Sequence, residues 1–308
     1  MDPITRAVLT SWEWRTTVII TLASAGVFYS IGWWRLRQRR RGEARLANRW
    51  RLASYWGGLL VIALALISPI DVLSGQLFFM HMIQHLLLVM IAPPLLMLAN
   101  PMPFVLWGLP AGARHIVGNW LTRLLNRRSP SRQWLRSLTG PGLVWFFLVC
   151  TLVGWHDPNA YNAALRSPRI HDLEHLTFFL PAALYWWLAT GAGPRLHKQM
   201  SLPARTAFVI AAIPPNMLIG MAIAFSSEPI YTYYLGVPRL WQIEVMLDQA
   251  LAGVIMWVPG SMMYIVAALI LIGRWFALEE QKPPLPVTLW STDEGMIAPG
   301  FKKGKEQK

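Results

Sequence analysis

Residues 79–85, with the sequence Phe79-Met80-His81-Met82-Ile83-Gln84-His85, lie at the start of a long apolar run. That run, residues 76–98, is long enough to cross the roughly 30 Å hydrocarbon core of a bilayer, which takes about 20 helical residues. A helix places side chains four positions apart on one face, so His81 and His85 face the same way. A later segment, His171-Asp172-Leu173-Glu174-His175, repeats this spacing at the start of another apolar run. The sequence therefore predicts two membrane helices that each present a pair of imidazoles near one end.

The composition is typical of a polytopic membrane protein. Hydrophobic residues make up 55% of the 308 residues, charged residues only 14%, and the chain contains 17 Trp. The net charge of +13 would suggest nucleic-acid binding in a soluble protein. In a membrane protein, however, Lys and Arg accumulate in cytoplasmic loops, so we expect no nucleic-acid partner. The single Cys150 excludes an internal disulfide and a cysteine-based zinc site.

The apolar runs predict an all-α fold, a polytopic membrane helix bundle of about seven transmembrane helices. The expected spans are residues 16–34, 53–70, 76–98, 143–155, 171–188, 207–225 and 244–272. We divide the chain into an outer N-terminal segment, residues 1–15, a transmembrane domain, residues 16–276, and a C-terminal tail, residues 277–308.

The basic residues predict the orientation of these spans. Arg is dense in the loops after the first, third and fifth spans, and the tail after the seventh is rich in Lys. The loops after the second, fourth and sixth spans carry only Arg166, Arg169 and Arg239. Because basic loops stay in the cytoplasm, we expect the N-terminus outside and the C-terminus inside the cell.

The long connection of residues 100–140 predicts a basic amphipathic segment on the cytoplasmic side. Apolar residues recur in it at helical spacing, at Ile116, Trp120, Leu121, Leu124 and Leu125, among six Arg. Such a helix can lie on an anionic membrane surface, which makes membrane lipid a partner of the protein. The alternative is a connecting helix that packs against other loops.

In this topology, polar groups from at least five helices fall in the outer half of the bilayer. An ionisable group inside a span is costly and usually faces the bundle interior with a partner. Coordination of a cation would remove most of the cost of burying imidazoles beside a carboxylate. We therefore expect a metal site with His81, His85, His171 and His175 as its principal ligands.

Other polar groups of the outer half are further candidates for this site. Asp71, Asp248 and Glu174 would be ligands or would orient an imidazole, and His156 is a weaker candidate. Hydrogen bonding between helices, or a proton relay, is the alternative reading of the same residues. His115 and His197 fall in inner loops and have no expected role.

The residue types around the site favour copper without excluding zinc or iron. Imidazole suits all three metals, whereas thioethers select cuprous copper. Methionines flank His81 and occur on helices that could approach it, at Met80, Met82, Met217, Met221 and Met246. The segment from His171 to His175 also matches the HxxEH pattern of some zinc peptidases, in which Glu174 would act as the base.

Several segments in the same order resemble the CtaG-like polytopic cytochrome c oxidase assembly proteins. The resemblance covers residues 53–276 and includes the segment from His171 to His175. It also rests on Ser68-Pro69-Ile70-Asp71, His81-Met82-Ile83-Gln84-His85-Leu86-Leu87, Ala92-Pro93-Pro94-Leu95-Leu96, Asp248-Gln249-Ala250-Leu251-Ala252-Gly253 and Met256-Trp257-Val258-Pro259-Gly260.

The resemblance implies an assembly factor for a haem-copper oxidase in the bacterial inner membrane, acting in copper supply. It implies functional roles for Asp71, His81, His85, His171, His175 and Asp248. The implied partners are cytochrome c oxidase subunits and a periplasmic copper chaperone, with the metal site toward the periplasmic face. An assembly and metal-binding protein is favoured over an enzyme. The alternatives are a b-type haem protein, an intramembrane metallohydrolase, and a scaffold without metal.

Overall fold

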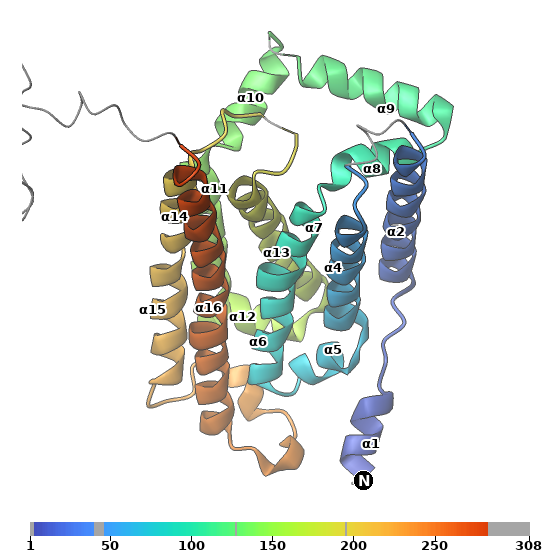
Figure 1. Ribbon diagram of the computed structural model, residues 1–308. Coiled ribbons are helices and arrows are strands. Elements are labelled where there is room, and N and C mark those ends of the chain that lie inside the picture. Colours follow the sequence, from blue (N-terminus) through green and yellow to red (C-terminus); the bar gives the residue numbers. More distant parts are fainter. Residues whose placement is uncertain (1–2, 40–45, 127, 195, 283–308) are drawn as a thin grey trace, which may run out of the picture.

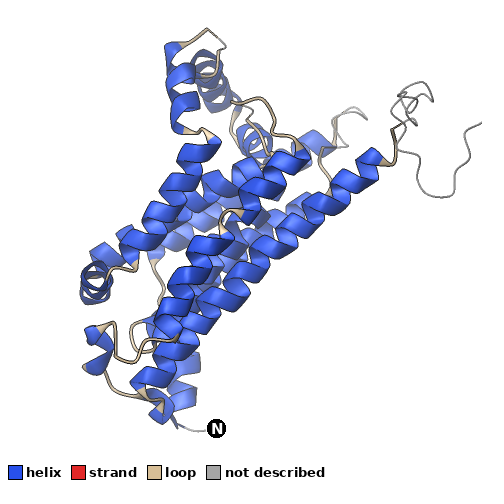
Figure 2. Cartoon of the chain, turned by 90° about the vertical axis from the view of Figure 1, so that its left-hand side faces the viewer, coloured by secondary structure: helices blue, strands red, loops and turns tan. Residues whose placement is uncertain are grey.

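The computed structural model describes residues 3–39, 46–126, 128–194 and 196–282. These residues form helices and no strand, which confirms the expected all-α class (Figures 1 and 2). Part of the expected basic loop, residues 40–45, and the Lys-rich tail from residue 283 onward lie outside the described residues. The division of the chain at residue 277 is therefore not tested.

Five long apolar helices or helix combinations can cross a membrane in the described part of the chain. They are α2 (Thr16–Arg37), α4 (Arg49–Ile67), the combination of α6 (Phe78–Leu86), η1 (Leu87–Ile91) and α7 (Ala92–Leu98), the combination of α14 (Leu202–Ile210) and α15 (Ile213–Ala224), and α16 (Val245–Glu279). A sixth candidate is the pair of α10 (Pro130–Leu138) and α11 (Pro141–Trp155), which bends by 51°. The count of seven spans and the orientation stay predictions.

The helix α13 (Pro168–Thr190) corresponds to the expected fifth span. It is 23 residues long and lies within the bundle (Figure 1). Its first turns contain the polar residues of the His171 to His175 segment, so it is less apolar than the other long helices. The remaining elements are α1 (Pro3–Thr10), α5 (Pro69–Ser74), α8 (Pro101–Gly108), α9 (Ala111–Leu124), α12 (Pro158–Arg166), η2 (Thr232–Leu235) and η3 (Leu240–Gln242).

Small residues allow two helix pairs to approach closely. A Cβ atom added to Gly253 of α16 would lie 2.4 Å from the backbone nitrogen of Ala224 in α15. A Cβ atom added to Gly32 of α2 would lie 1.7 Å from the backbone oxygen of Phe104 in α8. Close backbone approach at glycine is a common way to pack helices in membranes, where the hydrophobic effect between helices is weak.

The third span changes its winding just before Pro93 and Pro94. Proline has no N–H to donate to the carbonyl four residues earlier, and the helix widens here into the π-helical turn η1. The carbonyl of Val89 would normally accept from the residue at position 93. It accepts instead from the indole Nε1 of Trp186 in α13, at 3.0 Å. The fifth span thus satisfies a backbone group that the proline exposes. By contrast, α16 continues through Pro259 as one helix.

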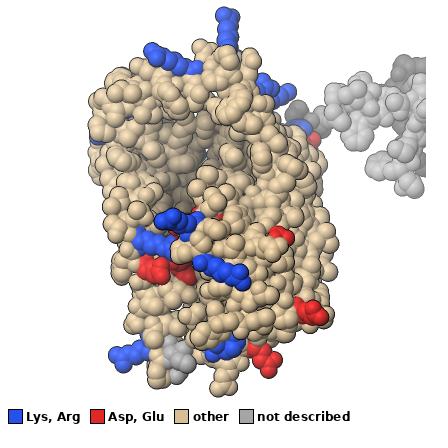
Figure 3. All heavy atoms as spheres, turned by 180° about the vertical axis from the view of Figure 1, so that it is seen from behind, with Lys and Arg blue, Asp and Glu red and all other residues tan. Residues whose placement is uncertain are grey.

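The two ends of the bundle differ in character. The basic helices α9 and α10 lie across the upper end in Figure 1, and α1, α5 and the N-terminal half of the third span lie at the lower end. Charged side chains on the face shown in Figure 3 gather at the two ends and in one cluster, which leaves much of the surface between them uncharged. That distribution fits a protein embedded in a bilayer.

The helix α9 does not pack against a core. None of its residues, all of which the structure describes, is buried, and Ile116 and Trp120 are 73% and 60% exposed. Of the two interpretations of this segment, an amphipathic helix on a lipid surface is therefore favoured.

Candidate metal centre

The helices α6 and α13 bring the two predicted imidazole pairs together. The Nε2 atoms of His81 and His85 lie 2.8 Å apart, which is hydrogen-bonding distance. The ring of His171 lies 5.0 Å from that of His81, and the ring of His175 lies 5.6 Å from that of His85, between centroids. The spacing of four residues puts each pair on one helix face, and the packing of the two helices turns these faces toward each other.

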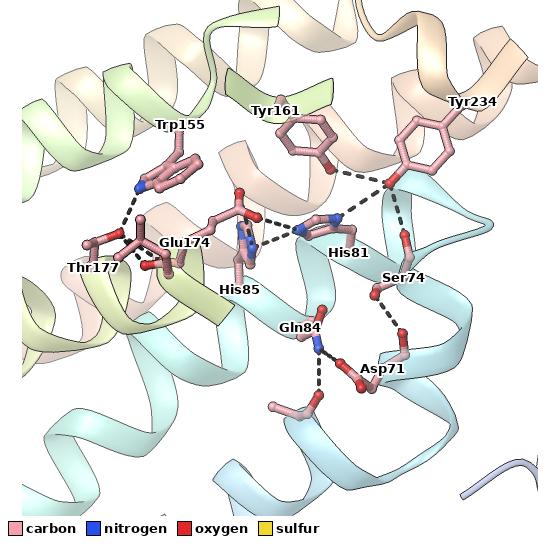
Figure 4. Close-up of polar contacts among 12 residues, drawn as sticks. Asp71, Ser74, His81, Gln84, His85, Trp155, Tyr161, Glu174, Thr177 and Tyr234 are labelled. Atoms are coloured by element: carbon pink, nitrogen blue, oxygen red, sulfur yellow. Dashed lines mark hydrogen bonds and ion pairs between the residues drawn. The ribbon is translucent and has the colours of Figure 1, made fainter. Parts of the chain in front are cut away.

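Glu174 completes this group. Its two carboxylate oxygens lie 3.6 Å from Nε2 of His81 and 3.7 Å from Nε2 of His85 (Figure 4). The side chain is fully buried between α6 and α13. We refer to His81, His85, His171, His175 and Glu174 as the histidine cluster.

The donor atoms of the histidine cluster are close enough to share an ion. One ligand atom each from His81, His85 and His175 lie within 4.8 Å of one another, and so do atoms from His81, His171 and Glu174. His81 belongs to both groups and lies at the centre. Imidazole and carboxylate together form a donor set for copper, zinc or iron.

Several donor atoms of the histidine cluster are buried without a partner. Both carboxylate oxygens of Glu174 and both ring nitrogens of His175 lack a hydrogen bond to any described residue, as do Nδ1 of His85 and Nε2 of His171. Buried polar atoms in proteins almost always have a partner, and unpaired ones indicate an absent water or ion. The residues present therefore fit a bound cation.

Tyr234, from η2, fixes the orientation of His81. Its hydroxyl donates to the backbone oxygen of Ser74 at 3.0 Å and lies 3.5 Å from Nδ1 of His81 (Figure 4). Because the hydroxyl proton is used on Ser74, the hydroxyl oxygen accepts from Nδ1–H of His81. That arrangement leaves the lone pair on Nε2, which faces His85 and Glu174. The hydroxyl of Tyr161 lies 3.4 Å from that of Tyr234.

Sequence reasoning missed Tyr234 and Tyr161. The loop between the last two predicted spans is rich in tyrosine, but nothing in its spacing links it to His81.

Asp248 lies at the N-terminus of α6 and contacts none of the imidazoles. Its carboxylate accepts hydrogen bonds from the backbone nitrogens of Phe78 at 3.0 Å and Phe79 at 2.9 Å. These are helix N-terminal groups that have no partner within α6. A carboxylate from α16 thus caps the helix that carries His81 and His85.

Asp71 also holds α6 in place, through Gln84. The Gln84 amide donates to a carboxylate oxygen of Asp71 at 2.6 Å and to the backbone oxygen of Ala65 at 2.7 Å. The other oxygen of Asp71 lies 2.9 Å from Nη2 of Arg15. Burial raises the pKa of Asp71 to about 6, although Arg15 and Gln84 act in the opposite direction.

His156 lies next to the histidine cluster rather than in it. Its Nδ1 is 2.7 Å from the backbone oxygen of Leu152, and its buried Nε2 has no partner among the described residues. A small cavity of about 40 Å³ is lined by both His85 and His156. That volume holds one or two water molecules.

One of the methionines that favoured copper lies beside an imidazole of the histidine cluster. Met82 is 3% exposed, and it lines the small cavity beside His85 together with Met90 and Met256. Met217 is 36% exposed and does not line that cavity.

A comparison with known proteins shows the family of this chain. The model of one family, the cytochrome c oxidase caa3 assembly factors (Caa3_CtaG), matches residues 27–277. This chain belongs to that family. The match contains every segment that carries the resemblance and all residues of the histidine cluster.

The chain is also similar to uncharacterised mycobacterial proteins. Relatives from Mycobacterium bovis and Mycobacterium tuberculosis are each 27% identical over 293 residues, and one from Mycobacterium leprae is 25% identical over 280 residues. The alignments cover 89%, 89% and 86% of this chain. The chain spans about 40% of the length of these relatives. No solved structure matches it significantly.

Proposed function

We propose that this assembly factor binds copper at the histidine cluster and supplies it during maturation of a haem-copper oxidase. One observation carries the proposal. Two imidazole pairs and Glu174, from helices far apart in the sequence, meet in the interior with donor atoms unpaired among the described residues. Polar groups placed in this way inside a membrane protein are costly unless they have a partner.

Copper is preferred to zinc and iron on two grounds. Imidazole nitrogens bind copper tightly, and a haem-copper oxidase, the client expected of the family, needs copper to mature. Glu174 is a harder oxygen ligand, so it either completes the coordination or balances the charge of the ion. Asp71 and Asp248 hold α6 in position.

The proposed site faces the periplasm in the bacterial inner membrane. The helix α6, which carries His81 and His85, lies in the half of the bundle away from α9 and α10 (Figure 1). Those two helices are basic, and basic segments stay on the cytoplasmic side. A site at the other end would be within reach of a periplasmic copper chaperone and of the oxidase subunits that receive copper.

The experiment that tests the proposal measures metal in the purified protein. We expect copper in wild-type protein by elemental analysis, and its loss when His81 and His85 are both changed to Ala. The matched control is His115→Ala, because His115 is an exposed imidazole on α9. Equal copper in wild type and the double variant would contradict the proposal. Wild-type protein that takes up no metal in any preparation would support the metal-free scaffold instead.

The geometry disfavours a b-type haem ligated by two imidazoles. The cavity beside His85 and His156 is far too small for a porphyrin. A larger cavity of about 460 Å³ reaches the histidine cluster, but His175 is the one imidazole in its lining. A Soret absorption band in the purified protein would reverse this conclusion.

A metallohydrolase remains the other chemical alternative, with Glu174 as its base. In the structure Glu174 lies between His81 and His85 of the facing helix, where it can serve as a ligand. Glu174→Gln separates the two roles. We expect lower copper affinity in this variant, whereas a catalytic base would leave copper bound and abolish a hydrolytic activity.

A further inference from the structure

Arg15 joins three acidic side chains next to the histidine cluster. It lies between α1 and α2, and its guanidinium nitrogens lie 2.7 Å from Asp172, 2.9 Å from Asp71 and 3.3 Å from Glu13. Three carboxylates surround one cation, so the group carries an excess of negative charge. Asp172 and Glu13 have side chains that are 62% and 51% exposed.

The Arg15 side chain lines two cavities that each reach the histidine cluster. A cavity of about 220 Å³ is lined by Glu13, Asp71 and His171 together with Arg15. The cavity of about 460 Å³ is lined by Asp172 and His175 together with Arg15. Arg15 thus borders both routes from the acidic group to the buried imidazoles.

The state of His175 indicates a ligand at the inner end of the larger cavity. It is 6% exposed, it lines the larger cavity, and neither ring nitrogen has a hydrogen-bond partner among the described residues. An imidazole in this state binds a cation or a polar group that arrives through the cavity. The larger cavity thus has an acidic residue, Asp172, and an unpaired imidazole, His175, in its lining. Both kinds of group attract a positive ion.

We propose that Glu13, Asp71 and Asp172 form an uptake site for a metal cation, which Arg15 occupies in the closed protein. An arriving cation competes with the guanidinium for the three carboxylates. When Arg15 moves aside, the cation reaches His171 and His175 and passes into the histidine cluster. The inference rests on the proposed metal-binding function and adds the route by which the ion enters.

The test follows the rate of copper uptake rather than the amount bound. Purified protein without metal is mixed with cuprous ion held by a chromogenic chelator, and transfer is followed by absorbance. Changing Glu13 to Gln and Asp172 to Asn together should slow uptake about tenfold, because the local field attracts the cation. The final copper content should stay that of wild type, since neither residue belongs to the histidine cluster. Uptake by wild type should also slow as salt is raised, and the double variant should lose much of that dependence.

Arg15→Gln should have the opposite effect and speed uptake several-fold, since it removes the competing cation. The matched controls are Arg169→Gln and Glu228→Gln, which change exposed charges outside both cavities. Should Arg15→Gln fold poorly, the Glu13 and Asp172 variants still decide the question, because both side chains are exposed. Unchanged rates in the acidic double variant would overturn the uptake site while leaving the metal centre intact. Wild-type protein that never takes up copper would instead overturn the proposed function.

Discussion

The Nε2 atom of His81 lies 2.8 Å from the Nε2 atom of His85, and Glu174 lies within 4 Å of both. Two neutral imidazoles can meet in this way only when one Nε2 carries a proton, or when both lone pairs face a common cation. The Nδ1 atom of His81 lies 3.5 Å from the hydroxyl of Tyr234, and with its proton on Nδ1 the Nε2 lone pair of His81 faces the cluster. This arrangement suits the cation that we propose.

Tyr234→Phe removes the hydroxyl that receives the Nδ1–H of His81. We expect copper affinity to fall on the order of tenfold, because partners that orient a ligating imidazole have effects of this size. Tyr233→Phe is the matched control, since its hydroxyl has no hydrogen bond to a described residue. The measurement is a competition titration against a chelator of known affinity. Equal affinities for the two variants would show that Tyr234 does not orient His81.

Asp248→Ala should destabilise the N-terminus of α6. Loss of a helix cap costs about 1–2 kcal/mol, and here the lost carboxylate accepts from two backbone nitrogens. We expect a lower melting temperature in detergent together with weaker copper binding, as α6 carries His81 and His85. The control is Glu244→Ala, an exposed acid at the start of the same helix α16. If Asp248 is instead a direct ligand, copper binding will fall with no change in melting temperature.

The sequence pattern predicted that the two imidazole pairs and Glu174 meet, but not where Asp71 and Asp248 lie. The HxxxH spacing fixes the face of each helix, and the cost of burying imidazoles predicts that the faces meet. Whether an acid contacts an imidazole or a backbone N–H depends on how helices pack. Asp248 and Asp71 were therefore expected at the site, whereas the structure uses them to hold α6. Nothing in the short segment around Arg15 indicated its ion pairs with Asp71 and Asp172, because these two partners come from distant parts of the chain.

The bond from Trp186 to the Val89 carbonyl predicts a specific loss of stability. Trp186→Phe leaves this buried carbonyl without its donor, because Pro93 cannot replace it. Trp187→Phe is the control, because the indole nitrogen of Trp187 is also buried but has no hydrogen-bond partner among the described residues. We expect Trp186→Phe to cost about 1–3 kcal/mol more than the control, measured by thermal or denaturant unfolding. Equal costs would mean that the carbonyl finds another donor.

The exposed apolar side chains of α9 predict contact with anionic lipid. On a Cys150→Ser background, spin labels are placed at Trp120→Cys and, as control, at Thr122→Cys on the opposite side of the helix. In vesicles that contain phosphatidylglycerol, the label at position 120 should be accessible to oxygen in the membrane, and the label at position 122 to a water-soluble relaxing agent. The same accessibility at both positions would indicate that α9 does not lie on the bilayer.

Anomalous diffraction from crystals of the copper-loaded protein would locate the metal itself. We expect an anomalous peak at the copper edge between α6 and α13, within bonding distance of His81 Nε2 and of at least one imidazole from α13. A copper peak elsewhere would contradict this expectation. Imidazole pairs that turn away from each other, with no metal between them, would contradict it as well.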